Sequence, residues 1–289
     1  WQQFSTPDRF TNWVCGLGVR RIEQSRWLSL GRRKKKILSM RRQKSKQRIL
    51  IRRKMGKPVF FTLTHCQKKL RGLSNQYNYK SNMHGLLFIG TKFFNVKYQA
   101  SIMTECNFRD SFLTGVDFFN SNMKGVSFKN ATLKNVVFYN CNLKGANFSG
   151  AKFEQVSFIC TNTACANNLD LSNDGVKIYT TYHSIQLPEN VERDLLSLSS
   201  NPLIFSAKVL HVNKNKLNHW ALQLIQEQFG LDGIEFLAKQ LGQKENCNNL
   251  YTVFSYLSLL EKVRVKWYNK YVLLRNHLWR MLTCINEDI

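Results

Sequence analysis

Residues 126–153, VSFKNATLKNVVFYNCNLKGANFSGAKF, place a large apolar residue at every fifth position. The same spacing continues without a break over 15 positions. These centre positions are Phe88, Phe93, Tyr98, Met103, Phe108, Leu113, Phe118, Met123, Phe128, Leu133, Phe138, Leu143, Phe148, Phe153 and Phe158. A period of five matches neither the α-helix nor the β-strand, whose side chains repeat every 3.6 and 2 residues. The pattern therefore indicates a repeat architecture.

The residues on either side of each centre are also restricted in type. Two positions before it, small or β-branched residues recur: Val96, Ser101, Cys106, Ser111, Val116, Ser121, Val126, Ala131, Val136, Cys141, Ala146, Ala151 and Val156. Two positions after it, turn formers recur: Asn95, Gly115, Asn120, Gly125, Asn130, Asn135, Asn140, Gly145 and Gly150. Gly and Asn tolerate left-handed backbone. The pattern predicts a coil that turns one corner every five residues, and stacked coils would bury a continuous inner column.

The segment CNLKGANFSGAKF, residues 141–153, resembles the A(D/N)LxN motif of the pentapeptide-repeat family, and the resemblance covers about residues 86–166. It implies a right-handed quadrilateral β-helix with 20 residues per coil and just under four coils. On that fold the centres divide among four sides: side 1 with Phe88, Phe108, Phe128 and Phe148; side 2 with Phe93, Leu113, Leu133 and Phe153; side 3 with Tyr98, Phe118, Phe138 and Phe158; side 4 with Met103, Met123 and Leu143.

Three domains are predicted. Residues 1–85 form a basic, partly helical extension, residues 86–167 the β-helix, and residues 168–289 an α-helical C-terminal domain. Apolar spacings of three and four predict the helices of this last part at residues 190–198, 215–230, 233–243 and 249–285. The ends of a short rod expose apolar side chains and unpaired backbone. We therefore expect the helical domain to cover one end of the rod.

Charge is unevenly distributed along the chain. The net charge is +25, and residues 1–96 carry 23 Lys and Arg against 2 Asp and Glu. An acid-poor basic block is suited to a polyanion, because each cation that reaches a phosphate releases counterions. The alternatives are a solvated tail, a targeting signal or a membrane-surface helix. The predicted nucleic-acid contacts are Arg32, Arg33, Lys34, Lys35, Lys36, Arg41, Arg42, Lys44, Lys46, Arg48, Arg52, Arg53, Lys54 and Lys57.

Enzymatic chemistry has no support in the sequence. No nucleotide-binding, zinc-hydrolase or serine-hydrolase motif occurs, and the eight cysteines form no CxxC pair. We predict no enzyme activity, metal, cofactor or small-molecule substrate. The cysteines are predicted to be reduced thiols in an intracellular compartment, with a zinc site as the alternative. No run of 18 apolar residues occurs, so no membrane span is predicted. The first residue is not Met, which is compatible with a processed or incomplete product, for example one from which an organelle import sequence was removed.

The family resemblance raises a second function, which charge opposes. The best-known members protect or inhibit DNA gyrase through an acidic rod that mimics DNA. The present repeat block carries a net charge of +3, and the position after the centre forms a predicted basic stripe across two adjacent sides: Arg109, Lys124, Lys129, Lys134 and Lys144. A basic rod cannot imitate duplex DNA.

The sequence therefore predicts a non-enzymatic structural protein of a large ribonucleoprotein, of ribosomal or organelle-ribosomal type, in the mitochondrion or the cytoplasm. The basic arm would contact RNA phosphates, with ribosomal RNA as the expected partner. The rod would act as a rigid spacer, and the rod and helical domain would contact other proteins. The alternatives are a protein-interaction adaptor or topoisomerase modulator, and a secreted bacterial effector that uses the rod for docking.

Overall fold

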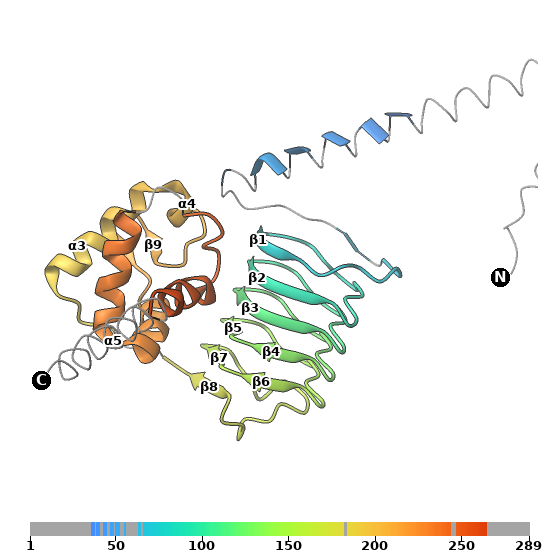
Figure 1. Cartoon of the computed structure of the whole chain (residues 1–289). Helices are drawn as coiled ribbons and strands as arrows, with labels where there is room; N and C mark the ends of the chain where they lie inside the picture. The colour runs from blue at the N-terminus through green and yellow to red at the C-terminus, as the bar shows by residue number, and fades with distance from the viewer. Residues whose placement is uncertain are drawn as a thin grey trace, which may run out of the picture. The chain divides into compact units, whose positions relative to one another are not determined.

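The rod is a parallel β-solenoid, as predicted, and it has about five turns where just under four coils were predicted. The computed structural model describes residues 36–37, 39–40, 43–44, 47–48, 50–52, 55, 63–64, 66–181, 184–243 and 247–264. Figure 1 shows the strands of the rod as successive layers. The strands are β1 (Ser74–Tyr79), β2 (Lys92–Gln99), β3 (Phe112–Phe119), β4 (Thr132–Lys134), β5 (Val137–Tyr139), β6 (Lys152–Glu154), β7 (Val156–Ile159) and β8 (Val176–Tyr179).

The register between layers is 20 residues throughout, which places equivalent centre residues above one another. On side 2, for example, Phe93 pairs with Leu113 and Leu133 with Phe153. On side 1 the Phe128 ring stacks between neighbouring phenylalanine rings at centroid distances of 5.4 and 5.0 Å. The predicted inner column is therefore confirmed, and its side chains form one buried cluster.

The predicted corner residues also adopt the predicted backbone. All nine have φ between +47° and +69°: Asn95, Gly115, Asn120, Gly125, Asn130, Asn135, Asn140, Gly145 and Gly150. Left-handed backbone is least costly for Gly and is readily adopted by Asn. Asparagine side chains also pair between layers, as where Asn140 Nδ2 donates to Asn120 Oδ1 at 2.9 Å. The corners therefore contribute hydrogen bonds along the rod as well as turns.

The solenoid begins earlier than the predicted boundary at residue 86. Strand β1 pairs in register with β2, and Met83 occupies an inward position on side 4. Before β1, the Leu63 N–H donates to the Asn82 carbonyl at 2.9 Å, and Leu70 packs against the inner column. The sequence pattern missed this coil because Asn78 stands where a large apolar centre was expected. Residues 63–85 were predicted to belong to the extension. Their described residues instead form the first layer of the solenoid or pack against it.

The solenoid also continues beyond residue 167, into the segment predicted as helical domain. Strand β8 pairs with β7, and Ile178 lies 20 residues after its partner Phe158. The sequence pattern did not predict this coil because Thr163, Asn168 and Asn173 interrupt the apolar series before Ile178. The last coil therefore depends on backbone pairing more than on inward apolar side chains.

The C-terminal domain is mainly helical, as predicted. Its elements are α3 (Glu189–Ser197), the 3-10 turn η1 (Leu198–Ser200), α4 (Pro202–Phe205), β9 (His211–Asn213), β10 (Lys216–Leu217) and α5 (His219–Gly242), followed by helical residues 253–264. Gly230 has φ 69° and ψ −174° inside α5 and separates the two predicted helical stretches. The β9–β10 hairpin, which occupies the start of the stretch predicted as helix 215–230, was not predicted. Of the predicted helix 249–285, residues 253–264 are helical, and the residues after 264 lie outside the described part of the chain.

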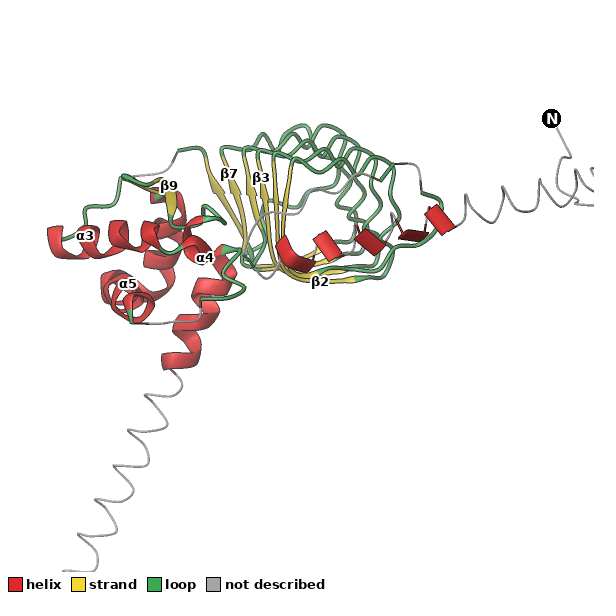
Figure 2. Cartoon of the chain, turned by 90° about the horizontal axis from the view of Figure 1, so that it is seen from above, coloured by secondary structure: helices red, strands yellow, loops and turns green. Residues whose placement is uncertain are grey.

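The helical domain packs along the length of side 3, and the expectation that it would cover one end of the rod is wrong. Tyr77 of the first layer, Val137 of a middle layer and Ile159 of a later one share one buried cluster with α3, α4 and α5. Seen from above, the helices lie beside the strands (Figure 2). The physical reason is that one column of outward residues on side 3, which contains Phe119, Tyr139 and Ile159, is largely apolar or aromatic, so this side required cover.

The N-terminal unit is described only in part. Its described residues between 36 and 51 are helical. The apolar side chains Ile37, Met40, Leu50 and Ile51 are about half exposed. Within this unit they are not buried in a core of their own.

Candidate functional site

Side 3 of the rod presents two columns of outward residues to the helical domain, and we call this surface the docking face. Each column contains one residue per layer, 20 positions apart. The first column is Tyr77, Lys97, Asp117, Val137, Ser157 and Lys177, and the second is Tyr79, Gln99, Phe119, Tyr139, Ile159 and Tyr179. Outward positions are expected to be polar on a solvated side. The apolar and aromatic content of these columns is thus explained by the domain that covers them.

Two opposite charges lie buried at the centre of the docking face. Lys97 and Asp117 are register partners on β2 and β3, and each is 1% exposed. Lys97 Nζ donates to the carbonyl oxygens of Ala207 at 2.7 Å and Lys208 at 3.3 Å, in the turn after α4. Asp117 Oδ2 accepts the Val253 N–H at 2.9 Å, at the start of the helical residues 253–264. The two charges therefore contact both parts of the helical domain.

The signs of these charges match the backbone groups that they meet. The first N–H groups of a helix lack intrahelical acceptors and carry partial positive charge, so a carboxylate is stabilised there. Carbonyl oxygens at the end of a helical turn carry partial negative charge and favour a cation. Lys97 also lies 5.3 Å from the centroid of the Phe119 ring and 5.8 Å from that of Tyr77. These contacts offset part of the cost of removing both charges from water.

Burial shifts the pKa of both groups toward the neutral form. It lowers the pKa of Lys97 to about 8, and the nearby Asp117 charge opposes this shift. It raises the pKa of Asp117 to about 6, against the Lys97 charge and the Val253 hydrogen bond. Asp117 Oδ1 is buried and has no hydrogen-bond partner among the described residues. Removing these two charges from water therefore costs free energy that offsets much of what their contacts contribute.

An aromatic stack and a polar corner complete the docking face. The Trp220 indole of α5 stacks on Phe119 at 5.9 Å and on Tyr139 at 5.0 Å. At the corner between sides 2 and 3, Asn95 Nδ2 donates to the Asn249 carbonyl at 2.7 Å, and the Thr252 hydroxyl donates to Asn95 Oδ1 at 2.8 Å. The rod thus holds the helical domain through both apolar contact and directed hydrogen bonds.

Gly115 occupies a corner of the rod against which a side chain of the helical residues 253–264 packs directly. A methyl group at Gly115 would lie 2.1 Å from Cδ1 of Phe254, and the backbone φ is +63°. Gly145 has φ +69° and no heavy atom within 4 Å of the same added methyl group. The two glycines therefore share the backbone constraint and differ in the contact.

We expect Gly115→Ala to destabilise the protein more than Gly145→Ala. Both variants carry a left-handed alanine, which costs about 1–2 kcal/mol. Gly115→Ala adds an overpacked contact with Phe254, worth a further 1–3 kcal/mol. Urea denaturation of the two variants measures the difference in unfolding free energy. Equal losses would show that the Phe254 contact does not constrain the corner.

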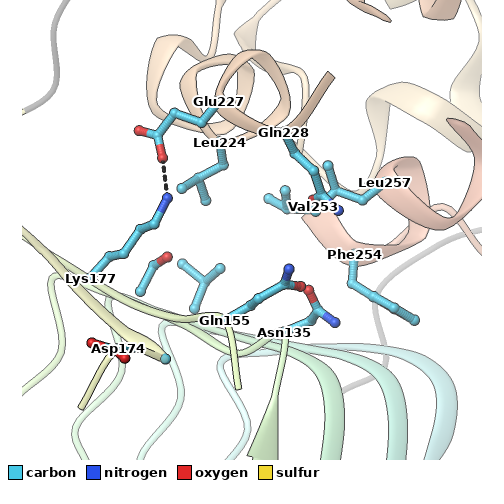
Figure 3. A pocket seen from close by; sticks show the side chains of 13 residues that line it. Asn135, Gln155, Asp174, Lys177, Leu224, Glu227, Gln228, Val253, Phe254 and Leu257 are labelled. Carbon is cyan, nitrogen blue, oxygen red and sulfur yellow. Dashed lines mark hydrogen bonds and ion pairs between the residues drawn. The ribbon is translucent and has the colours of Figure 1, made fainter. Parts of the chain in front are cut away.

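A cleft of about 230 Å³ opens between the rod and the helical domain next to Phe254 (Figure 3). Asn135 and Gln155 line it from the rod, and Leu224 and Gln228 line it from α5. At its far side, Lys177 Nζ contacts Glu227 Oε2 at 2.9 Å, and the Tyr179 hydroxyl donates to the same oxygen at 2.6 Å. Lys177 and Tyr179 of the rod therefore contact Glu227 of the helical domain. The cleft lies between these two parts and belongs to the docking face.

The described residues contain no arrangement that indicates catalysis. They hold no group of three side chains able to bind a metal ion. Burial raises the pKa of the Cys106 thiol to about 11 and that of Cys141 to about 12, so neither is a reactive thiolate near neutral pH. Among the described residues, no helix combines the length and apolar character that a membrane crossing requires.

The predicted basic arm is only partly within the described residues. Lys36, Lys44 and Arg48 are exposed, and Arg52 is partly exposed. The remaining predicted contacts lie outside the described residues: Arg32, Arg33, Lys34, Lys35, Arg41, Arg42, Lys46, Arg53, Lys54 and Lys57. Their role stays a prediction.

The predicted basic stripe is exposed but is divided among three sides of the rod. Lys124 and Lys144 lie on side 4, Arg109 and Lys129 on side 1, and Lys134 on side 2. Two of the five are paired with acids, since Arg109 Nε lies 3.1 Å from Asp110 Oδ2 and Lys134 forms an ion pair with Glu154. The stripe is therefore less continuous and less strongly charged than the sequence suggested.

The docking residues were not singled out from the sequence, although a signal was present. Writing the repeat in rows of 20 places Phe119, Tyr139 and Ile159 in one outward column, where the other sides are mostly polar. That column predicts a covered side. The identity of the covering helices, and the burial of Lys97 and Asp117 beneath them, could not be derived from periodicity.

A parallel solenoid with a 20-residue coil, apolar centres and Asn or Gly corners defines a repeat rod, here with a helical domain docked on one side. Residues 91–167 match the family model described as "Pentapeptide repeat region", so this part of the chain is a pentapeptide-repeat region. No curated protein matches the chain.

Solved structures of pentapeptide-repeat proteins also match the chain. A protein from the Arabidopsis thaliana thylakoid lumen is 19% identical over 35% of this chain and 71% of its own, with a TM-score of 0.25. A protein from Nostoc is 19% identical over 46% of this chain and 93% of its own, with a TM-score of 0.27. QnrB1, a plasmid-mediated fluoroquinolone resistance protein, is 19% identical over 38% of this chain and 56% of its own, with a TM-score of 0.25.

Proposed function

We propose that the protein is a non-enzymatic, RNA-binding scaffold of a ribonucleoprotein, in an organelle such as the mitochondrion or in the cytoplasm. Pentapeptide-repeat proteins are generally structural or interaction proteins. The observation that carries the RNA partner is the charge of residues 1–96, with 23 cations and 2 acids. The described cations Lys36, Lys44 and Arg48 are exposed on helical backbone, where they are free to meet a polyanion.

The docking face supports the scaffold part of the proposal. Buried charges, an aromatic stack and corner hydrogen bonds join the rod and the helical domain into one body. A joined body can hold partners at a fixed separation, which is what a scaffold requires. Partner proteins would contact the sides of the rod that the helical domain leaves open.

The charge of the rod argues against the alternative function, which is to bind a gyrase-type topoisomerase by imitating DNA. On the open sides of the repeat, Asp110 and Glu154 are each paired with a cation and do not form an acidic surface. The exposed residues Lys124, Lys129 and Lys144 have the wrong sign for that role. A supercoiling assay with a gyrase-type topoisomerase should therefore show neither protection nor inhibition.

We expect the basic arm to dominate the salt dependence of RNA binding. Changing Lys36, Lys44, Arg48 and Arg52 together to Gln in the full chain removes four charges. If all four contact phosphates, the slope of log K against log salt should fall in magnitude by about 3, since each single-strand contact contributes about 0.7. Fluorescence anisotropy with a labelled single-stranded RNA, at several salt concentrations, measures this slope.

The matched control changes four exposed cations of the helical domain to Gln, namely Arg193, Lys214, Lys216 and Lys239. The control should keep the slope of the unmodified chain. A slope that falls equally in both variants would mean that net charge, and not the arm, determines binding. A slope unchanged in the arm variant would remove these four residues from the interface.

A further inference from the structure

Side 2 of the rod carries an exposed aromatic residue between two exposed lysines. Lys92, Phe112, Thr132 and Lys152 form one outward column, linked layer by layer through the register of β2, β3, β4 and β6. Phe112 is 49% exposed, and both lysines are exposed. We call this column the side-2 column.

The fold does not require a phenylalanine at position 112. The inward residues of side 2 are Phe93, Leu113, Leu133 and Phe153, and they supply the apolar core of this side. The register neighbours of Phe112 are Lys92 and Thr132, neither of which offers an apolar surface of similar size. Large apolar side chains in open positions are more informative than those in cores, because they often mark a binding surface.

Phe94, the other exposed phenylalanine on side 2, has a structural explanation. Its ring meets that of Phe254 edge to face at a centroid distance of 5.8 Å. Phe94 therefore belongs to the border of the docking face. Phe112 lies in the neighbouring column, outside that border.

The charges around Phe112 favour an anionic partner. Lys92 is one layer from Phe112 and Lys152 is two layers away, which at ~4.8 Å per layer places the lysine backbones ~14 Å apart on a flat sheet. Among the outward side-2 positions from β2 to β6 the only acid is Glu154, and it forms an ion pair with Lys134. The column thus has one lysine on each side of the Phe112 ring.

An aromatic ring on an open sheet, with cations along the same line, is the arrangement with which proteins bind single-stranded nucleic acid. The bases stack on the ring, and the backbone phosphates follow the cations. A duplex hides the faces of its bases and cannot use such a ring. An acidic peptide would use the lysines but would gain little from Phe112.

We propose that the side-2 column binds single-stranded RNA, with Phe112 stacking on a base and Lys92 and Lys152 contacting phosphates. The proposal deepens the proposed RNA-binding function and rests on it. It assigns a second contact to the rod itself, which would then bind RNA and not serve only as a spacer.

The test uses the full chain and a fluorescein-labelled 12-nucleotide oligouridine, with a blunt RNA duplex of the same length as comparison. Phe112→Ala should weaken oligouridine binding at least about fivefold, since loss of one base stack costs ~1 kcal/mol or more. It should leave the salt slope and duplex binding unchanged. The Lys92→Gln/Lys152→Gln variant should lower the salt slope by about 1.4.

The matched controls are Thr132→Ala, in the same column, and Lys124→Gln/Lys144→Gln, two exposed lysines on side 4. Thr132→Ala should leave oligouridine affinity within twofold. The side-4 lysine variant should have no more than half the effect of the side-2 lysine variant on the salt slope.

The outcomes separate this proposal from the function on which it rests. Oligouridine binding that depends on the arm but is unchanged by Phe112→Ala would overturn the side-2 proposal and leave the proposed function in place. Equal loss of oligouridine and duplex binding in Phe112→Ala would also overturn it, because stacking requires an unpaired base. If the full chain binds neither the oligouridine nor the RNA duplex, the side-2 proposal and the proposed RNA-binding function are both wrong, and an acidic protein becomes the partner to test.

Discussion

Replacing Lys97 by methionine is expected to lower the free energy of unfolding of the rod and helical domain by about 3–5 kcal/mol. The substitution leaves the Asp117 carboxylate buried without its cation and removes the hydrogen bonds to the Ala207 and Lys208 carbonyls. Urea denaturation followed by circular dichroism measures the loss. The loss should be larger at pH 7 than at pH 5, because Asp117, whose pKa is raised to about 6, is mostly charged at pH 7 and mostly protonated at pH 5, while Lys97, whose pKa is lowered to about 8, is still mostly charged at pH 7.

Two further variants test the origin of that loss. Lys134→Met removes the cation of an exposed ion pair with Glu154 and should cost less than about 1 kcal/mol. Lys97→Met/Asp117→Asn keeps an acceptor for the Val253 N–H and has no buried charge, so it should be more stable than Lys97→Met alone. If adding Asp117→Asn gives no recovery, the loss comes from the missing hydrogen bonds to the Ala207 and Lys208 carbonyls and not from an unpaired carboxylate.

Phe128→Ala is expected to destabilise the rod by about 3–5 kcal/mol, the range for truncating a buried aromatic residue. The Phe128 ring is fully buried and stacks on Phe108 and Phe148, with Phe118 and Phe138 at its edge. Layers above and below fix the backbone, so the cavity cannot collapse easily. Urea denaturation again gives the change in unfolding free energy.

The control for this prediction is Phe112→Ala, the same substitution at an exposed position of the next layer up the rod. It should change the unfolding free energy by no more than about 0.5 kcal/mol. A large loss in Phe112→Ala would mean that its ring contributes to the fold, which would also remove the basis for assigning it to RNA. A small loss in Phe128→Ala would mean that the inner column is loosely packed.

The repeat could be predicted in detail because its determinants are local. Each group of five residues contains its own large centre, small partner and turn former, and the 20-residue register follows from their sum. The positive φ at Asn120 and Gly125 follows from their position two residues after a centre, together with residue types that tolerate left-handed backbone. The helices α3 and α5 were predicted for a similar reason, since their apolar spacing lies within one segment.

The limits of the rod could not be predicted from the same pattern. Asn78 and Thr163 break the apolar series, yet the backbone next to them continues to pair with the neighbouring layer, as where the Gly145 N–H donates to the Cys165 carbonyl at 2.8 Å. Parallel strands within a solenoid are held by hydrogen bonds that any residue except proline can donate. The pattern of side chains therefore underestimates how far the coils extend.

For the candidate site, too, some features could be predicted from the sequence and others required the tertiary structure. Exposure of Lys124 and Lys144 followed from their place after a centre, whereas the ion pair of Lys134 with Glu154 required the register of the next layer. Lys97 occupies an outward position that sequence alone assigns to solvent. The helical domain, more than 100 residues later in the chain, is what buries it.

The sequence by itself determined the solenoid, its four sides, its corners and the basic character of the chain, because these depend on residue types at fixed short spacings. Only the tertiary structure decided that the helical domain covers side 3, that Lys97 and Asp117 are buried there, and that Phe112 remains open on side 2. The reason is that burial depends on which surfaces meet, and residues such as Asp117 and Val253, separated by 136 positions, meet only after both domains have formed.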